Sequence, residues 1–232
     1  MKRISFLLAL CLPLIGFCQK QTIATDKATY DGSLWAKRLY YLQWVQGTDN
    51  YMYYKDNNLA IFDSKGTQVG GIDLQKLSQT YSLKGNPTIS YIDANQLVIE
   101  EGNKFHIYDY VIEKPLFTIT LPENAQNAEY NHTQRAVAYT LDNNLFLATA
   151  EEPRFPIAVF KDENIISGQF IHRNEFGIQK GIFWSPNGNY IAFYQKDVSQ
   201  VTDYPLVDIN TTPASVKSIK YPMAGGKNEI AK

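Results

Sequence analysis

The sequence predicts an all-β protein built as a partial β-propeller of about four blades, each a four-stranded antiparallel sheet. Three observations support this prediction. Tyrosine occurs 16 times and aromatic residues make up 13% of the chain, a composition typical of strands. Aromatic and β-branched residues come in short runs separated by Asn, Asp and Gly. These runs recur in one order (inner run, hairpin with a polar tip, outer run) at intervals of roughly forty to fifty-five residues, a period typical of propeller blades.

The first residues predict a secretory signal peptide over residues 1–18. Lys2 and Arg3 give a basic start, and the residues that follow are apolar almost throughout. Gly16 and Cys18 are small residues at the −3 and −1 positions of a cleavage after Cys18. A lipoprotein with acylated Cys18 is a weaker alternative, because bulky Phe17 precedes it. A buried N-terminal helix is weaker still.

The signal peptide implies export to a periplasmic or extracellular location, with a membrane tether at the start as the alternative. Cys11 and Cys18 are the two cysteines, so a chain cleaved after Cys18 has none for a disulfide, a thiolate nucleophile or a metal site. Without Lys2 and Arg3, 20 basic residues face 23 acidic ones, and no basic stripe attracts nucleic acid. No later apolar run is long enough to span a membrane.

The blades are expected in order along residues 19–232. Helical turns are expected only at 28–41 and 72–77, since no segment keeps a 3.6-residue apolar period. The inner runs are residues 41–45, 88–92, 127–131 and 181–185. The hairpins are residues 51–63, 96–110, 135–150 and, less regularly, 189–197. Outer-strand candidates follow three of them, at 117–121, 157–160 and 216–221.

A β-sandwich also has short strands and frequent turns, and it stays open as an alternative. The repeated four-part order favours the propeller. Four blades close a ring poorly, and an open ring exposes strand edges. We therefore expect 19–232 to be an incomplete propeller, the first part of something longer.

The run "HRNEFGIQKGIFWSPNGNYIAFYQKDVSQVTDYPLVDI", residues 172–209, carries a family resemblance. It resembles the N-terminal β-propeller of the dipeptidyl peptidase IV subfamily of prolyl oligopeptidase-like serine peptidases, in particular the bacterial exported members. "KYPMAGGKN" and the early "YYLQWVQGTDNYMYYKDNNLAIFD" are similar to the same family. The resemblance is densest from about residue 163 onward.

The resemblance implies an eight-bladed propeller joined to a C-terminal α/β-hydrolase domain with a Ser-Asp-His triad, a domain absent from this chain. It implies peptide substrates with Pro, or Ala, near the N-terminus, from which dipeptides or tripeptides are released. The propeller would restrict access, and its acidic residues would hold the free amino group of the peptide through charge-assisted hydrogen bonds.

In the family, those acidic residues lie on an insertion just before the "WSP" strand. Here that place reads "HRNEFGI", in which Glu175 is the carboxylate, so the resemblance implies that Glu175 binds the peptide amine. A solvated loop glutamate is the alternative. The family's second contribution, an arginine on a long loop of the second blade, has no counterpart in "EEGNKFHIYDY", and we assign no residue to it.

The chain itself offers no catalytic residue, because no G-x-S-x-G elbow occurs. His106, His132 and His172 lack metal-ligand spacing, and no glycine-rich phosphate loop is present, so neither a metal nor a cofactor is expected. Ser185 is expected to form a turn, Trp184 to pack between blades, and His106 to be a packing or surface residue.

The sequence thus favours the N-terminal propeller portion of an exported proline-specific serine exopeptidase. An exported β-repeat binding or scaffold module, for which a homodimer would complete the ring, is the alternative from another class. A truncated gene product without activity of its own is the third interpretation.

Overall fold

The computed structural model describes residues 23–36, 38–171 and 176–232. They belong to two compact units: one ends at Tyr40, and the other runs from Tyr41 to Lys232. The described part of the first unit contains one short helix, α2 (Thr25–Thr29). The predicted signal peptide, residues 1–18, lies outside the described residues.

The helical turns predicted for 28–41 are wrong for most of that range. The backbone leaves the helix after Thr29, and the Asp31 carboxylate accepts hydrogen bonds from the Ser33 amide and hydroxyl, both at 2.7 Å. Such a side-chain turn competes with helix continuation. Gly32 then takes a φ of 69°, which an α-helix does not accommodate.

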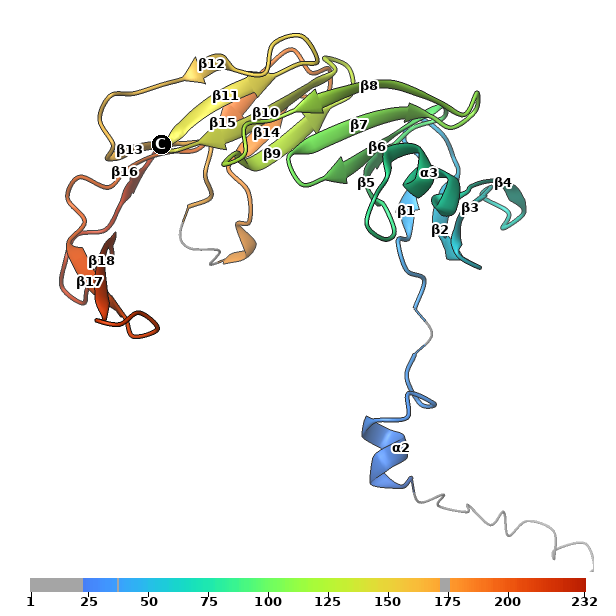
Figure 1. Cartoon of the computed structure of the whole chain (residues 1–232), viewed down its shortest axis with the longest axis horizontal. Coiled ribbons are helices and arrows are strands. Elements are labelled where there is room, and N and C mark those ends of the chain that lie inside the picture. The colour runs from blue at the N-terminus through green and yellow to red at the C-terminus, as the bar shows by residue number, and fades with distance from the viewer. Residues whose placement is uncertain (1–22, 37, 172–175) are drawn as a thin grey trace, which may run out of the picture. The chain divides into compact units, whose positions relative to one another are not determined.

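The second unit contains three complete four-stranded antiparallel sheets, so the predicted all-β fold with propeller-like blades is confirmed (Figure 1). Each sheet uses its strands in chain order, as the repeat predicted. The first consists of β1 (Gln43–Trp44), β2 (Tyr51–Lys55), β3 (Asn58–Phe62) and β4 (Gln68–Ile72). The second consists of β5 (Thr88–Ile92), β6 (Gln96–Glu101), β7 (Lys104–Asp109) and β8 (Lys114–Thr120). The third consists of β9 (Gln126–Asn131), β10 (Ala136–Leu141), β11 (Asn144–Ala148) and β12 (Phe155–Ala158).

The predicted polar tips form tight turns between the middle strands. Asp56 and Asn57 link β2 to β3 with φ values of 49° and 62°. Gly102 and Asp142 start the corresponding turns of the next two sheets at φ values of 57° and 49°. Gly, Asn and Asp tolerate positive φ better than other residues, which is why the turns could be located in the sequence.

Two elements near the first sheet differ from the prediction: one strand was not predicted, and one helix is longer than expected. Strand β4 has no predicted counterpart, because Gly70 and Gly71 interrupt its apolar pattern. Helix α3 (Leu74–Tyr81) extends the turns expected at 72–77, and the Asp73 carboxylate caps it by accepting from the Lys76 amide at 3.0 Å. Neither described helix has the length and hydropathy needed to cross a membrane.

The fourth repeat is assembled differently from the other three. Strands β14 (Ile182–Trp184) and β15 (Ile191–Phe193) pair with each other, as expected of an inner run and the strand after it, but the hairpin predicted to begin at residues 189–197 does not form. The chain continues into β16 (Gln195–Asp197), which lies between β13 (Ile165–Ser167) and β19 (Ile230–Ala231).

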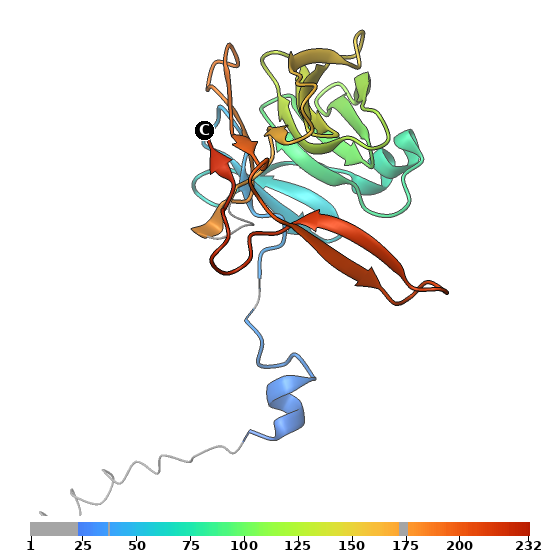
Figure 2. The ribbon, with the colours of Figure 1, turned by 90° about the vertical axis from the view of Figure 1, so that its left-hand side faces the viewer.

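The predicted outer strand at 216–221 does not complete the fourth blade. Strand β18 (Ser215–Lys220) pairs with β17 (Asp203–Asp208) over six residue pairs, as the red two-stranded ribbon in Figure 2. The two strands are linked by a short turn around Asn210, so pairing with each other closes a much shorter loop than pairing with a distant strand.

The core lies between the sheets and buries both faces of their middle strands. Leu97 and Ile99 of β6 point into a cluster shared with the first sheet, whereas Val98 points into a cluster shared with the third. All three side chains are at most 1% exposed. On β10, Val137 and Ala138 divide in the same way between the second sheet and the β14–β15 hairpin. Each central strand therefore depends on two neighbouring sheets.

Tyrosines line the seams between the sheets. Burial raises the pKa of Tyr81, Tyr110 and Tyr130 to about 12 each. The Tyr110 hydroxyl donates to the Asp93 carbonyl at 2.7 Å, and the Tyr130 ring meets the edge of Tyr91 at a centroid distance of 6.0 Å. The folded state thus favours the neutral phenols.

We predict that the fold loses stability in alkali. An unfolded tyrosine ionises near its ordinary pKa of about 10. The folded-state pKa of Tyr130 is higher, so the stabilisation is complete below about pH 10 and is lost as the pH rises from about 10 to 12. Urea midpoints at pH 8 and pH 11 should show this loss. Tyr130→Phe should reduce it, whereas Tyr190→Phe, at a 74% exposed side chain, should leave it unchanged. An equal loss in both variants would contradict the prediction.

Candidate functional site

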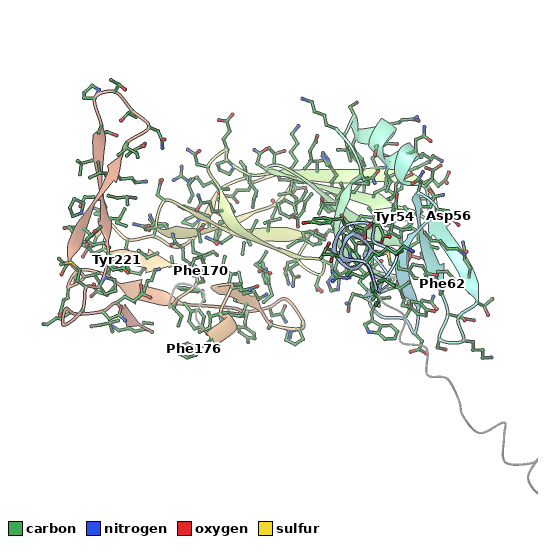
Figure 3. The ribbon with its side chains drawn as sticks, turned by 90° about the horizontal axis from the view of Figure 1, so that it is seen from below. Tyr54, Asp56, Phe62, Phe170, Phe176 and Tyr221 are labelled. Atoms are coloured by element: carbon green, nitrogen blue, oxygen red, sulfur yellow. The ribbon has the colours of Figure 1, made fainter. Side chains whose placement is uncertain are left out.

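The candidate site lies on the segment that connects β13 to β14. Glu175, which the resemblance implies as the amine-binding residue, lies outside the described residues, as do His172, Arg173 and Asn174. The structure describes both ends of the segment, residues 168–171 and 176–181. Figure 3 labels Phe170 and Phe176, one on each side of the gap.

The two ends of this segment meet at a single residue, Tyr194. The Gly168 amide donates to the Tyr194 carbonyl at 2.8 Å, and the Tyr194 amide donates to the Gly181 carbonyl at 2.9 Å. Tyr194 lies between β15 and β16, and its ring meets Phe183 edge-on at 5.4 Å between centroids. The chain therefore leaves and re-enters the sheets at one place, a neck formed by Gly168, Gly181 and Tyr194.

Gly181 is required by the close approach of the two ends. A Cβ atom at this position would lie 2.3 Å from both the carbonyl carbon and the carbonyl oxygen of Gln169. No side chain fits at that distance without moving backbone. The local sequence "QKGIF" does not indicate this role, because the contact joins Gly181 to Gln169, a residue outside that stretch.

The largely shielded side chain of Lys196 contacts the first described part of the segment, residues 168–171. The Lys196 ammonium on β16 donates to the Phe170 carbonyl at 3.3 Å and lies 3.6 Å from a carboxylate oxygen of Glu229. Both side chains of this ion pair are only 15% exposed. The same ammonium lies 5.9 Å from the centroid of the Phe170 ring.

A second ion pair links the other described end of the segment, residues 176–181, to the third sheet. Lys180 lies 3.2 Å from the Glu129 carboxylate and 5.4 Å from the ring centroid of Phe183. The indole of Trp184 donates to the Glu129 carbonyl at 2.9 Å. This contact joins β14 to β9, so the prediction that Trp184 packs between blades is confirmed. The Glu129 carboxylate therefore has a cationic partner in Lys180.

Ser185 serves the turn after β14, as predicted. Its hydroxyl oxygen accepts from the Tyr190 amide at 3.0 Å, and its carbonyl accepts from the Gly188 amide at 2.8 Å. Gly188 has a φ of 72°, and a Cβ there would lie 2.6 Å from the Asn131 amide oxygen. Gly188 in this turn therefore has a left-handed backbone conformation and is tightly packed. The hydrogen bonds of Ser185 stabilise the turn, which is a structural role.

The described histidines act in packing. His106 is buried, with Nδ1 2.9 Å from Thr118 Oγ1, Nε2 3.3 Å from Glu101 Oε2, and its ring 4.4 Å from that of Tyr81. His132 stacks on Tyr91 at 4.8 Å. Within the described ranges no three His, Cys, Asp or Glu side chains gather as a metal site would require.

The second sheet offers no long loop for the family's substrate-contacting arginine. Strands β6 and β7 pair up to Glu101 and Lys104, so only Gly102 and Asn103 lie between them. Arg135 and Arg154 instead lie over aromatic rings of the second and third sheets, at 5.6 Å from Phe117 and 4.8 Å from Phe146. No residue is assigned to that role.

Comparison with known proteins identifies the family. The model of the dipeptidyl peptidase IV (DPP IV) N-terminal region matches residues 100–232, more than half of the chain. The chain belongs to this family. The DPP IV resemblance inferred from residues 172–209 is thereby confirmed, and the chain is the N-terminal region of a DPP IV-like peptidase.

Individual relatives agree with the DPP IV assignment. A crystal structure from Bacteroides ovatus, described as a dipeptidyl aminopeptidase IV, is 33% identical, covers 87% of this chain and superposes with a TM-score of 0.69. Dipeptidyl peptidase 4 of Sus scrofa is 24% identical over 230 residues, or 88% of the chain. Dipeptidyl peptidase 4 of Porphyromonas gingivalis is 17% identical over 91% of the chain with a TM-score of 0.55, which shows the shared fold.

The chain is much shorter than these relatives. It spans 29% of the B. ovatus chain, 29% of the S. scrofa protein and 33% of the P. gingivalis chain. The activity and substrates of the whole relatives therefore come to this chain only as a proposal.

We predict that Gly181→Ala disturbs the neck and destabilises the fold by roughly 1–3 kcal/mol, the usual cost of overpacking. Gly70→Ala is the matched control, since the nearest atoms to an added Cβ there, on Ile61, are 3.9 Å away. Urea unfolding of both variants measures the difference. A Gly181→Ala protein as stable as the wild type would show that the neck opens without cost.

Proposed function

We propose that this chain is the N-terminal propeller portion of an exported proline-specific serine exopeptidase that releases dipeptides or tripeptides. In this proposal the propeller limits access to the active site and binds the amino terminus of the peptide. The DPP IV match over residues 100–232 is the single observation that carries the proposal. The hydrogen bonds of Tyr194 add support, because they hold the two described ends of the segment, Gly168 and Gly181, at one residue of the sheet region.

Glu175 is the proposed amine-binding residue. A peptide ammonium needs a carboxylate partner in a partly desolvated cleft, where a charge-assisted hydrogen bond is strongest. Fixing the amine fixes the number of residues between it and the nucleophile. The carboxylate would thereby set the length of the released peptide. Pro, or Ala, at the cleaved position completes the proposed substrate.

The catalytic triad is proposed to lie in an α/β-hydrolase domain outside these 232 residues. Export, through the predicted signal peptide of residues 1–18, belongs to the same proposal. So does a homodimer, for which β17 and β18 offer exposed apolar side chains such as Leu206, Val207 and Val216, at 50–65% exposure.

We predict that residues 19–232, purified free of host peptidases, do not hydrolyse a chromogenic X-Pro substrate. The reason is the missing G-x-S-x-G nucleophile elbow. Release of chromophore that scales with the amount of protein, and is abolished by a serine-directed inhibitor, would contradict this.

We further predict that Glu175→Gln, in the peptidase that carries this region, raises KM for a free-amine X-Pro substrate at least about tenfold. Loss of a hydrogen bond between charged groups costs about 1.5–3 kcal/mol, which corresponds to this range. Glu163→Gln, at an exposed glutamate before β13, is the matched control and should leave KM unchanged. Equal KM values for Glu175→Gln and wild type would remove Glu175 from the proposal.

A further inference from the structure

The connection between the second and third strands distinguishes the fourth repeat from the first three. Strands β3, β7 and β11 follow β2, β6 and β10 after tight turns, and each of them buries three or more residues. In the fourth repeat, residues 198–229 separate β16 from β19, and they include the β17–β18 ribbon. Strand β19 then pairs with β16 on the edge opposite β13. It takes the third-strand position, so the ribbon is an insertion before it.

Strands β15 and β16 form one run of chain whose two edges have different partners. On one edge, the amide of Tyr194 donates to the Gly181 carbonyl, and its carbonyl accepts from the Gly168 amide. On the other edge, the amide and carbonyl of Gln195 bond to Lys232, at 3.0 and 2.7 Å. Strands β13 and β14 therefore use one edge of the run, and β19 uses the other.

The second edge continues along β15 without a partner strand. Backbone groups of successive residues face opposite edges of an antiparallel strand, so Phe193 and Ile191 direct their amides and carbonyls to the same edge as Gln195. Among the described strands, β15 pairs with β14 alone, and β14 lies on the other edge. An unpaired strand edge is a template for a further strand.

A groove of about 590 Å³ lies between β15 and the third sheet. Its walls include Leu147 of β11, Ile157 of β12 and Ile191 of β15, and none of the described residues that line it is charged. Ile191 and Phe193 pack against a core cluster shared with the third sheet, whereas Ile157 stays 38% exposed. A strand placed beside β15 would direct every second side chain into this groove.

We propose that the open edge of β15 and this groove bind an extended strand that continues the ladder of β19 and completes the fourth sheet. Each step from the pair of Gln195 and Lys232 moves one residue back along β15 and one forward along the strand. The second and fourth residues after Lys232 thus lie opposite Phe193 and Ile191. Because directly opposite residues share a face, these two are apolar, and the residue between them faces away from the third sheet.

The occupant is a strand of the same longer peptidase and not a separate protein. The register of β16 and β19 already leads onto the open edge, so a strand in continuation of β19 needs no further loop to pair. The chain spans 29% of the B. ovatus relative, whose remaining length can contain such a strand. This inference rests on the proposal that the chain belongs to a longer peptidase, and it requires nothing of Glu175.

Amide hydrogen exchange along β15 tests the pairing. In the 232-residue chain, the amides of Ala192 and Tyr194 face the edge used by β14 and should exchange slowly, whereas those of Ile191 and Phe193 should exchange quickly. Protection therefore alternates along the strand. In the longer peptidase all four amides should be protected, with exchange at Ile191 and Phe193 slowed at least about tenfold.

Three results of this measurement would overturn the inference. Fast exchange at Ile191 and Phe193 in the longer peptidase would show that the edge stays open there. Protection of both amides in the 232-residue chain that is lost on dilution would show that a second copy supplies the strand. Protection in that chain at every concentration would show that the edge is already paired within it.

Ile157→Lys tests whether side chains of the strand enter the groove. The ammonium would be buried against apolar side chains, which is costly, so the strand should dock more weakly. In the longer peptidase, exchange at Ile191 and Phe193 should then speed up at least about tenfold. Val69→Lys is the matched control, because Val69 is 55% exposed on the outer strand β4 of a complete sheet. Equal exchange in the two variants would refute docking in the groove.

The outcomes separate this inference from the proposed function, because they report backbone protection and not hydrolysis. If Glu175→Gln leaves KM unchanged, the proposed amine site is wrong and the docked strand is unaffected. If the longer peptidase hydrolyses the X-Pro substrate while Ile191 and Phe193 exchange quickly, the proposed function stands and the docked strand is refuted.

Discussion

The burial of both faces of each middle strand is the constraint on which the rest of this structure depends. A strand with one solvated face alternates apolar and polar side chains, whereas β6 and β10 carry apolar residues at consecutive positions. Leu97 and Val98 cannot both be buried by one neighbouring sheet, so two are needed. Stability in this protein is therefore shared along a row of sheets, and each seam supports the next.

The outer strands follow the opposite rule. Strands β4 and β12 are mostly exposed and each buries one residue, at Ile72 and Ala158. Strands β4 and β12 thus add little to the core, and β4 tolerates Gly70 and Gly71.

Local chemistry explains what could be predicted from the sequence. The tight turns at Asp56, Gly102 and Asp142 depend on residues that accept positive φ, and the turn at Ser185 depends on its own hydroxyl, so the letters alone locate them. The pairing of β18 with β17, the crowding at Gly181 and the contact from Lys196 to Phe170 could not be read in this way. Each joins residues that are brought together only when the sheets pack. A glycine or a lysine in a polar stretch has no local sequence pattern that indicates such a contact. The amine-binding prediction rests on Glu175 and stays a prediction.

The double use of Tyr194 has a consequence for how such a protein can change over evolutionary time. Tyr194 holds both ends of the segment, so the ends stay together when residues are added or deleted between them. Such changes in length alter the entropy of loop closure only slightly. The segment is in effect a replaceable insert with a constant attachment point. Variation in its length would leave the attachment at Tyr194 and the sheets around it unchanged.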